Sequence, residues 1–164
     1  MSGRSSDSAS PVIRPARVSD AARLAALNDR LMAEHRAYSP LFEVRPESEA
    51  MVAGYLRRML RTKTHRAWIA EAGGEAVGYL WVVVQERPPI YVALRIGCVL
   101  DLYVAKPWRR RGIGRALVNL ATSWCREQGL GHVELMAASK NRAGLAAWRS
   151  YGFREYGRHL HSTI

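Results

Sequence analysis

The sequence predicts one α/β domain, built on a mixed β-sheet with helices on both faces. Its 164 residues are enough for about one domain. Runs of strand character alternate with runs of helical periodicity. Antiparallel hairpin signals dominate the first half of the chain, and a strand–helix–strand unit occupies the second. Such a unit places its two strands in parallel through a right-handed crossover, so the predicted sheet contains both kinds of pairing.

The composition excludes several classes of protein. A content of 48% hydrophobic and 24% charged residues is typical of a globular domain rather than a disordered chain. Cys98 and Cys125 are the only cysteines and form no CxxC motif, which excludes a disulfide scaffold and suits a reducing compartment. The longest apolar run is about nine residues, whereas a membrane-spanning helix needs about 20.

The sequence divides into a short N-terminal tail and a single domain. Residues 1–10 are rich in serine and predict a disordered tail, without the apolar core of a secretory signal. Residues 11–164 show no linker or internal repeat and are expected to form the single domain. We therefore expect a cytoplasmic protein that does not enter a membrane.

The elements of the first half are predicted from periodicity and turn residues. Pro15 confines the first strand to an edge or an end of the sheet. Ser19 and Asp20 are suitable N-cap residues for a helix with a leucine stripe, and Gly73-Gly74 marks a hairpin. The expected elements are a strand at 12–17, helices over 20–38 and 46–61, and strands at 66–72 and 76–85.

The second half holds the clearest helix of the chain. Apolar residues recur along 112–128 at the spacing of a helix face, and Gly129 and Gly131 end it. An apolar strand at 96–104 precedes this helix and a strand at 132–136 follows it. The remaining expected elements are a short helix at 141–151, stopped by Gly152, and a last strand at 154–160.

The charge is strongly basic, with a formal net charge of +11. Of the 25 basic residues only three are lysines, which leaves 22 arginines. A basic balance favours nucleic acid, anionic surfaces or phosphorylated small molecules as partners. The arginines are spread over the whole chain and are concentrated in one place, where Arg109, Arg110, Arg111 and Arg115 surround two glycines.

This arginine cluster lies where a strand meets a helix. Free amide groups at a helix start, with the helix dipole, form an anion site, and Gly112 and Gly114 let the backbone approach the anion. The Gly-Lys-Ser/Thr of a P-loop is absent, and the third glycine of a dinucleotide fingerprint would fall on Leu117. The remaining pattern is Arg-x-x-Gly-x-Gly. Its alternative interpretation is a glycine cap before a surface helix.

The segment LYVAKPWRRRGIGRALV resembles the signature motif of the GNAT superfamily of N-acetyltransferases. A second stretch, with Asn141, Trp148, Gly152 and Phe153, resembles the family's Asn-x6-Tyr-x3-Gly-Phe pattern. The resemblance implies a twisted sheet of about six to seven strands with a splayed parallel pair, and acetyl-CoA as cosubstrate. It also implies that one loop holds the pyrophosphate, through Arg109, Arg110, Arg111, Gly112, Ile113, Gly114 and Arg115.

The resemblance assigns further cofactor contacts. In the family a bulge splays the strand before the loop, and the pantetheine arm pairs with its backbone. Leu102, Tyr103 and Val104 occupy the matching positions, and one of their N–H groups would polarise the acetyl carbonyl. Asn141 would lie near the pantetheine arm, and an N-cap role is compatible with this. Trp148 would pack on the cofactor.

Asp101 is the only acid in the strand 96–104. A carboxylate within an apolar strand is costly unless it is solvated, paired or used. An amine must lose its proton before it attacks a thioester, and Asp101 is the candidate group that accepts it. The alternative is a structural carboxylate. Glu34, His35 and Glu43 are weaker candidates for the same role.

The chain departs from the family at the acid that protonates the leaving thiolate. Many relatives carry tyrosine where this chain has Trp148, whose indole is no useful acid. Tyr151, three residues on, is the candidate replacement, although packing in the core is the favoured interpretation. The histidines have no ligand-like spacing with each other or with the cysteines, so no metal is expected.

These observations predict an acetyl-CoA-dependent N-acetyltransferase. The acceptor would be a primary amine on a small molecule or a peptide, bound by helices 20–61 and the loop 86–95. The alternative is a non-catalytic module on the same fold that senses CoA or binds nucleic acid. Clustering of arginine at the loop disfavours nucleic acid. A homodimer is common for the family and stays open.

Overall fold

The computed structural model describes residues 10–164, so nearly all of the predicted N-terminal tail lies outside the described residues. The elements follow the predicted order as far as the last helix. They are β1 (Val12–Pro15), η1 (Val18–Asp20), α1 (Ala21–His35), η2 (Pro40–Phe42), α2 (Ser48–Met59), β2 (His65–Ala72), β3 (Glu75–Glu86), β4 (Arg95–Val104), η3 (Lys106–Trp108), α3 (Ile113–Glu127), β5 (Val133–Leu135) and α4 (Arg142–Ser150), where η denotes a 3-10 turn.

The described residues form one five-stranded sheet in chain order, β1-β2-β3-β4-β5. The first three pairings are antiparallel and the β4–β5 pairing is parallel, which confirms the predicted mixed sheet. Pro15 lies in an edge strand, as its missing N–H requires. Gly73 and Gly74 have φ angles of 58° and 83° and close the β2–β3 hairpin.

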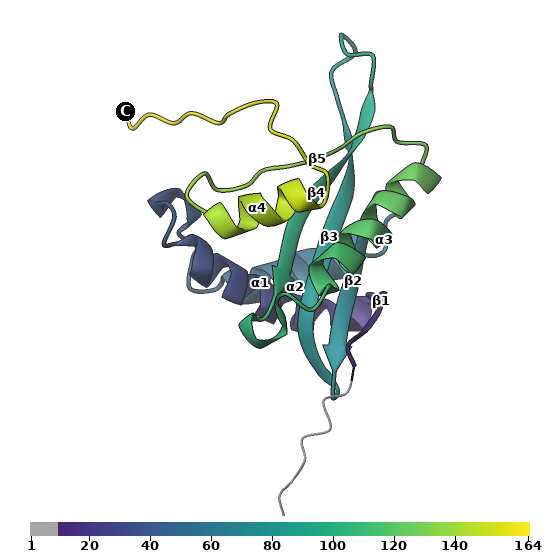
Figure 1. Cartoon of the computed structure of the whole chain (residues 1–164), viewed down its shortest axis with the longest axis vertical. Helices are drawn as coiled ribbons and strands as arrows, with labels where there is room; N and C mark the ends of the chain where they lie inside the picture. Colours follow the sequence, from purple (N-terminus) through teal and green to yellow (C-terminus); the bar gives the residue numbers. More distant parts are fainter. Residues whose placement is uncertain (1–9) are drawn as a thin grey trace, which may run out of the picture.

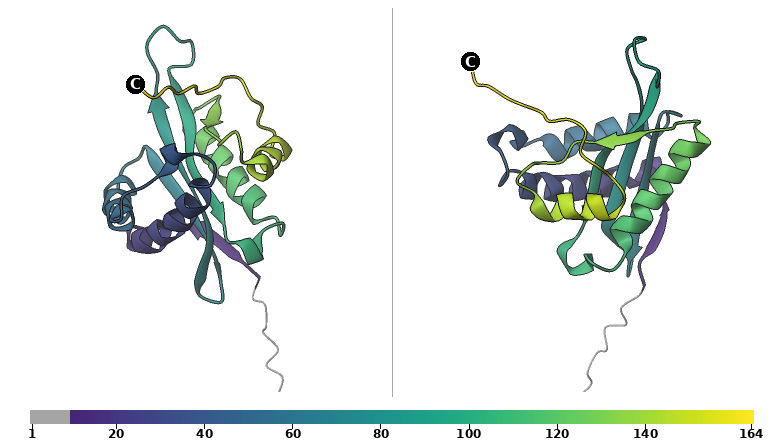
Figure 2. Two further views of the ribbon diagram at one scale, coloured as in Figure 1. Left: turned by 90° about the vertical axis from the view of Figure 1, so that its left-hand side faces the viewer. Right: turned by 45° about the horizontal axis from the view of Figure 1, so that its top comes forward.

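Helices cover both faces of the sheet (Figure 2). Helices α1 and α2 bury Leu24, Leu27 and Leu56 against one face, together with Tyr79 and Trp81 of β3. Helix α3 covers the other face with most of its predicted stripe. Its buried residues are Ile113, Leu117, Val118, Ala121 and Cys125. Two apolar layers therefore hold the sheet between them.

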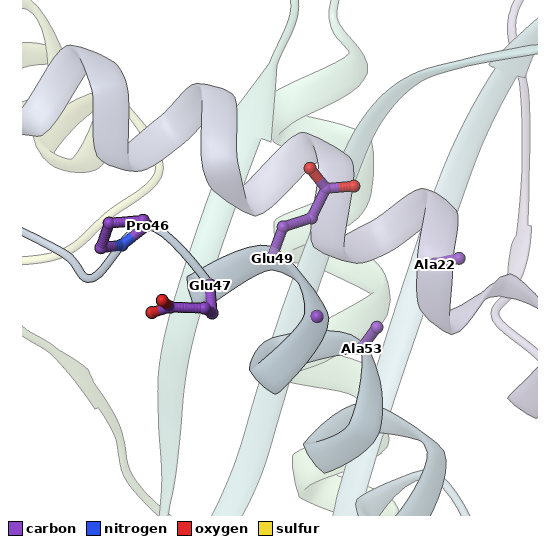
Figure 3. Close-up of a pocket in the computed structure, with 6 residues that line it drawn as sticks. Ala22, Pro46, Glu47, Glu49 and Ala53 are labelled. Carbon is purple, nitrogen blue, oxygen red and sulfur yellow. The ribbon is translucent and has the colours of Figure 1, made fainter.

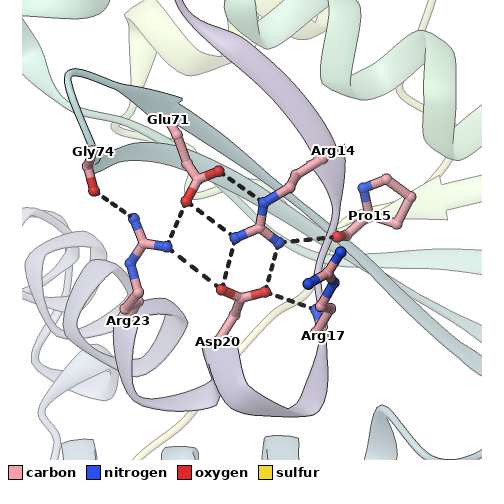
Figure 4. Close-up of polar contacts among 7 residues, drawn as sticks. All are labelled: Arg14, Pro15, Arg17, Asp20, Arg23, Glu71 and Gly74. Atoms are coloured by element: carbon pink, nitrogen blue, oxygen red, sulfur yellow. Dashed lines mark hydrogen bonds and ion pairs between the residues drawn. The ribbon is translucent and has the colours of Figure 1, made fainter.

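A polar network ties the edge of the sheet to α1 (Figure 4). The guanidinium of Arg14 donates to both oxygens of Asp20, over 2.7 and 2.9 Å, and to Glu71. Arg23 of α1 reaches the same two carboxylates. Hydrogen bonding to Arg14 lowers the pKa of Asp20 to about 2 against the opposing effect of burial. Every charge in this network is paired within the chain.

The end of the chain differs from the prediction. Residues 154–160 were expected to form a last strand, but they are not paired with the sheet, whose last described strand is β5. This segment has no buried face, since Tyr156 and Leu160 are 80% and 93% exposed. The described sheet consequently has five strands rather than the expected six to seven. Figure 1 shows this segment running away from the sheet.

Candidate active site

A bulge in β4 decides which way Asp101 faces. The register with β3 pairs Asp101 with Trp81 but Val99 with Val82, so Leu100 is an extra residue in β4. Residues two apart in a regular strand share a face, and one inserted residue reverses this. Val99 accordingly packs beneath α3, whereas Asp101 shares the face of Trp81, beneath α1 and α2.

Beyond the bulge, β4 leaves its parallel neighbour. The β4–β5 ladder contains only three pairs, from Gly97–Val133 to Val99–Leu135. Residues 100–104 of β4 therefore have β3 on one side and no strand on the other. This is the splayed parallel pair that the family resemblance implied.

The main-chain groups that face the gap follow from the register. The amide of Ala105 donates to Val77 of β3, and hydrogen-bonded pairs recur at every second residue of an antiparallel ladder. Tyr103, which pairs with Tyr79, therefore directs its main chain to β3. Leu102 and Val104 direct theirs into the gap. Of the three predicted backbone contacts, these two have the geometry to receive a ligand.

The loop after β4 presents unpaired amides at the start of α3. Among the described residues no backbone acceptor is recorded for the amides of residues 110–115. Two left-handed residues shape the turn, Arg110 with φ 61° and Gly112 with φ 81°. A non-glycine residue there costs about 1 kcal/mol or more. A strained turn that aims several N–H groups outward at a helix start is a site for an anion.

The two glycines of the motif have different roles in this structure. A Cβ at Gly112 would meet nothing within 4 Å, so this glycine is needed for its left-handed backbone. A Cβ at Gly114 would lie 2.6 Å from the hydroxyl of Tyr151. Gly114 therefore makes room for Tyr151, and the wall of the loop is formed partly by α4.

The four arginines of the loop are not equivalent. Arg109 pairs with Glu34, and Arg115 donates to the carbonyl of Ser150 over 3.0 Å. The guanidinium carbon of Arg111 lies 4.9 Å from the centre of the Trp108 ring. Arg110 is exposed and has no hydrogen bond recorded within the described chain. Of the four, only Arg109 has its charge balanced by a carboxylate, so Arg110, Arg111 and Arg115 keep charge to offer an anion, and Arg110 and Arg111 have no hydrogen bond within the described chain.

Asp101 is held by groups from α1 and β3. The Asn28 amide donates to its Oδ2 over 3.3 Å. The Tyr79 hydroxyl is buried beside it without a hydrogen-bond partner among the described residues. Burial raises the pKa of Asp101, opposed by Tyr79, Asn28 and the charge of His35. A carboxylate with a raised pKa is a better proton acceptor.

The weaker candidates for the base are occupied elsewhere. Glu34 pairs with Arg109. The Nδ1 of His35 lies 2.9 Å from the carbonyl oxygen of Leu31. Glu43 is exposed and lies 3.8 Å from Arg36. Asp101 is half-buried, lies in the splayed strand itself and has no cationic side chain paired with it among the described residues.

The residues of the second motif lie in α4 and at its ends. Asn141 caps this helix, since its Oδ1 accepts from the Gly144 amide over 2.9 Å. Trp148 packs edge-on against Tyr151 and Phe153. Burial raises the pKa of Tyr151, and its hydroxyl lies against Gly114, in the turn that begins α3. This placement favours the packing interpretation of Tyr151 over the acid.

A surface depression lies away from these groups. It is bordered by α1, α2 and the chain that leads into α2 (Figure 3). None of its lining residues belongs to β4, the loop or α4, so we assign it no part in the site. They are Ala22, Pro46, Glu47, Glu49, Ala50 and Ala53.

Sequence reasoning missed Asn28 and Tyr79. Nothing local marks them, because Asn28 lies 73 residues from the carboxylate it contacts. The β3–β4 hairpin, which contains the loop expected to help form an acceptor pocket, projects beyond the rest of the sheet (Figure 1).

A splayed parallel strand pair, followed by an anion-binding turn at a helix start, defines an acyl-CoA-binding transferase fold. The family model of the acetyltransferase (GNAT) family matches residues 28–153. The chain therefore belongs to the GNAT family of acetyltransferases.

Individual relatives agree with this membership. The chain is 31% identical over 97 residues to N-acetyltransferase family 8 member 3 of Rattus norvegicus, a match that covers 59% of this chain and 42% of the relative. A predicted acetyltransferase of Clostridium acetobutylicum, solved with acetyl-CoA, superposes with a TM-score of 0.78 at 18% identity, covering 94% of this chain and 96% of that one.

Aminoglycoside N-acetyltransferase AAC(6')-Iy, solved with CoA, superposes with a TM-score of 0.77 at 16% identity, covering 100% of this chain and 99% of that one. At these identities the superpositions show the shared fold. The chain spans two fifths to one half of the length of the curated relatives that it matches first. Within residues 10–164, no helix has the length and apolarity needed to traverse a bilayer.

Proposed function

We propose that this chain transfers an acetyl group from acetyl-CoA to a primary amine by direct attack of the amine on the thioester. The observation that carries the proposal is the set of unpaired amides over residues 110–115, next to a strand that has lost its parallel partner. Similar folds solved with acetyl-CoA and with CoA support the choice of cosubstrate.

The loop would hold the pyrophosphate. The amides of Gly112, Ile113 and Gly114 and the charges of Arg110 and Arg111 meet the requirements of a doubly charged group. Arg115 adds charge, and Tyr151 lines the turn beside Gly114. Trp148 supports this wall from α4.

The splayed strand would position the acyl group. Leu102 directs its amide and carbonyl, and Val104 its amide, into the gap, where an amide-containing arm can complete the interrupted ladder. An N–H that points at the carbonyl oxygen stabilises the charge it gains in the transition state. Asn141, at the start of α4, lies on the chain that follows β5 and supports the other side of the gap.

Asp101 would accept the proton of the amine, directly or through a water molecule. The nitrogen forms a bond to the acetyl carbon as the carbon–sulfur bond breaks, and the sulfur leaves with the electron pair of that bond. We assign protonation of the thiolate to solvent, since Trp148 offers no acid and Tyr151 lies at the phosphate loop.

The acceptor side would be formed by α1 and the chain that leads to α2. A primary amine is cationic until it is deprotonated, and Asp101 faces α1. The aminoglycoside enzymes of similar fold act on amines of small molecules, and this supports a small-molecule acceptor over a peptide.

The proposal is tested by acetyl-CoA-dependent thiol release over a panel of amines, with CoA binding measured by calorimetry. The decisive variant is Gly112→Asp, which places a side chain and a negative charge at the turn. Gly129→Asp is the matched control, because Gly129 lies beyond the other end of α3, has φ 75° and also has open space around it.

We expect Gly112→Asp to weaken CoA binding by about 100-fold or more. Gly129→Asp should bind CoA like the wild type, with a similar loss of thermal stability. Equal CoA affinity in the two variants would overturn the loop assignment. CoA binding without thiol release from any amine would favour the sensing module. Salt-sensitive binding to DNA or RNA without CoA binding would favour a nucleic-acid module.

Exposed features of the fold support a homodimer, and the free cysteines support a cytoplasmic location. We propose a homodimer, because β5 has one open edge among the described strands and Ile90, Val92 and Leu94 are exposed on the β3–β4 hairpin. A second copy presents the same edge and hairpin for isologous contact. Sedimentation of the wild type against Val92→Asp tests this. The two free cysteines support a cytoplasmic location.

A further inference from the structure

The first arginine of the loop motif is committed to a contact within the chain. One guanidinium nitrogen of Arg109, Nη2, donates to both carboxylate oxygens of Glu34 over 2.7 and 3.0 Å. Its Nε donates to the carbonyl of Val104 over 2.7 Å. Its guanidinium carbon lies 5.6 Å from the centre of the Tyr103 ring. Two of its three nitrogens are therefore occupied, and its charge is balanced.

These contacts join three elements that meet at the site. Glu34 lies in the last turn of α1, next to His35. Val104 ends the splayed part of β4, and Arg109 begins the loop that is proposed to hold the pyrophosphate. Because Val104 directs its main chain into the gap, no strand pairs its carbonyl, and the side chain of Arg109 satisfies it instead. The bond also fixes the end of the splayed segment.

The contacts of Arg109 depend on the shape of its guanidinium as well as on its charge. A planar guanidinium can bind a carboxylate and a carbonyl at the same time in fixed directions, whereas a lysine ammonium is a single point charge. Glu34 is 27% and Arg109 39% exposed in their side chains, so water screens the pair and its energy is modest. The pair therefore matters because it fixes the relative positions of Glu34, Val104 and the loop, and contributes little to stability.

We infer that Arg109 is a positioning residue that fixes the end of α1 to the splayed strand and the loop, and that it does not bind the cofactor phosphate. This inference rests on the proposed function, because it concerns the alignment of the acceptor side with the cofactor side. Arg110 and Arg111 are left as the arginines of the loop that meet the phosphate.

The test compares Arg109→Gln, Arg109→Lys, Glu34→Gln and the double variant Glu34→Gln/Arg109→Gln. Binding of CoA is measured by calorimetry. Hydrogen exchange is measured over residues 32–38, where the amides of Arg36 and Tyr38 donate to Met32 and His35. Arg110→Gln serves as the contrasting variant, since Arg110 is a proposed phosphate contact.

We expect Arg109→Gln and Glu34→Gln to bind CoA within about threefold of the wild type, as expected for an exposed pair that does not touch the ligand. Exchange at the end of α1 should accelerate by about twofold to fivefold in each, as expected for the loss of an exposed ion pair. The double variant should exchange no faster than either single variant. Arg109→Lys should behave like Arg109→Gln, because charge alone does not restore the contact.

A phosphate-binding Arg109 makes the opposite predictions. Glu34→Gln would release the guanidinium and tighten CoA binding. Arg109→Gln would weaken CoA binding as much as Arg110→Gln does, and Arg109→Lys would restore it. Either result overturns the inference. Failure of the wild type to bind CoA would instead count against the proposed function, so the two failures are distinguishable.

Discussion

Two arginine-rich regions, one at the β1 edge of the sheet and one in the loop before α3, use the arginine side chain differently. At the sheet edge, Arg14 and Arg23 are paired with Asp20 and Glu71 by hydrogen bonds and ion pairs. At the loop before α3, the amides of residues 110–115 and the guanidinium of Arg110 have no recorded partner within the described chain. In the first region every charge has a partner within the chain, whereas the second is the region proposed to bind an anion.

The difference separates stability from function. A satisfied network stabilises the fold, and removing one member leaves a poorly solvated charge behind. Most of the loop is exposed, so its amides and guanidinium groups can be solvated in the free protein and can exchange that water for a ligand. Variants of the edge network should therefore unfold more easily without a specific effect on CoA binding. Variants of β4 and the loop should lose CoA binding or activity with little change in the free energy of unfolding.

The largest expected effect is that of Asp101→Asn. Loss of the proton acceptor should reduce kcat/KM by about 100- to 10,000-fold. Stability should not fall. The pKa of Asp101 is raised in the folded state, so the folded protein loses stability as pH rises through that pKa, and asparagine avoids this loss. Thiol-release kinetics and thermal unfolding at pH 8 measure both effects; activity within threefold of the wild type would exclude Asp101 as the base.

The second-largest effect is expected for Asp20→Asn, which removes one carboxylate from the network at the sheet edge and lowers stability. We expect the free energy of unfolding to fall by about 2–3 kcal/mol, since Arg14 loses a buried partner. The pKa of Asp20 is lowered to about 2. Its contribution is therefore fully present above its unfolded pKa and is lost as pH falls toward 2. Urea unfolding at pH 7 and pH 3 should show a smaller pH dependence in the variant, and unchanged CoA affinity.

A smaller effect is expected for Asn28→Ala. The Asn28 amide lowers the pKa of Asp101, so its removal should raise that pKa. The acidic limb of the kcat/KM profile should move to higher pH by about half to one unit. Activity at high pH should change little, which separates this role from a general loss of structure. A profile that keeps its midpoint would show that Asn28 does not act on the carboxylate.

The smallest effect is expected for Arg158→Ala. Arg158 and Glu155 form an ion pair with side chains 80% and 53% exposed, three residues apart. Exposed pairs of this kind contribute about 0–1 kcal/mol, so unfolding and CoA binding should both be unchanged. This variant is the reference for the comparison, because it measures how much an arginine outside both regions contributes to stability and to CoA binding. A loss similar to that of Asp20→Asn would mean that the C-terminal segment packs elsewhere.

The loop and the order of elements could be predicted because their signals are local. Helix periodicity at 112–128 and the glycine-containing turn before it depend on neighbours within a few residues. The same holds for Gly73-Gly74 and for Asn141 as a helix cap. The strand expected at 154–160 was wrong because these residues are all exposed and bury no face, although the outer edge of β5 is open.

The sequence alone determined which residues carry chemistry here: an acid within an apolar strand, glycines at a helix start, and arginines around them. Tertiary structure decided what each one faces. An extra residue at Leu100 turned Asp101 toward α1, packing of α4 placed Tyr151 against Gly114, and α1 brought Glu34 to Arg109 across 75 residues. Backbone preferences act over a few residues, whereas the partner of a side chain depends on how distant elements pack together.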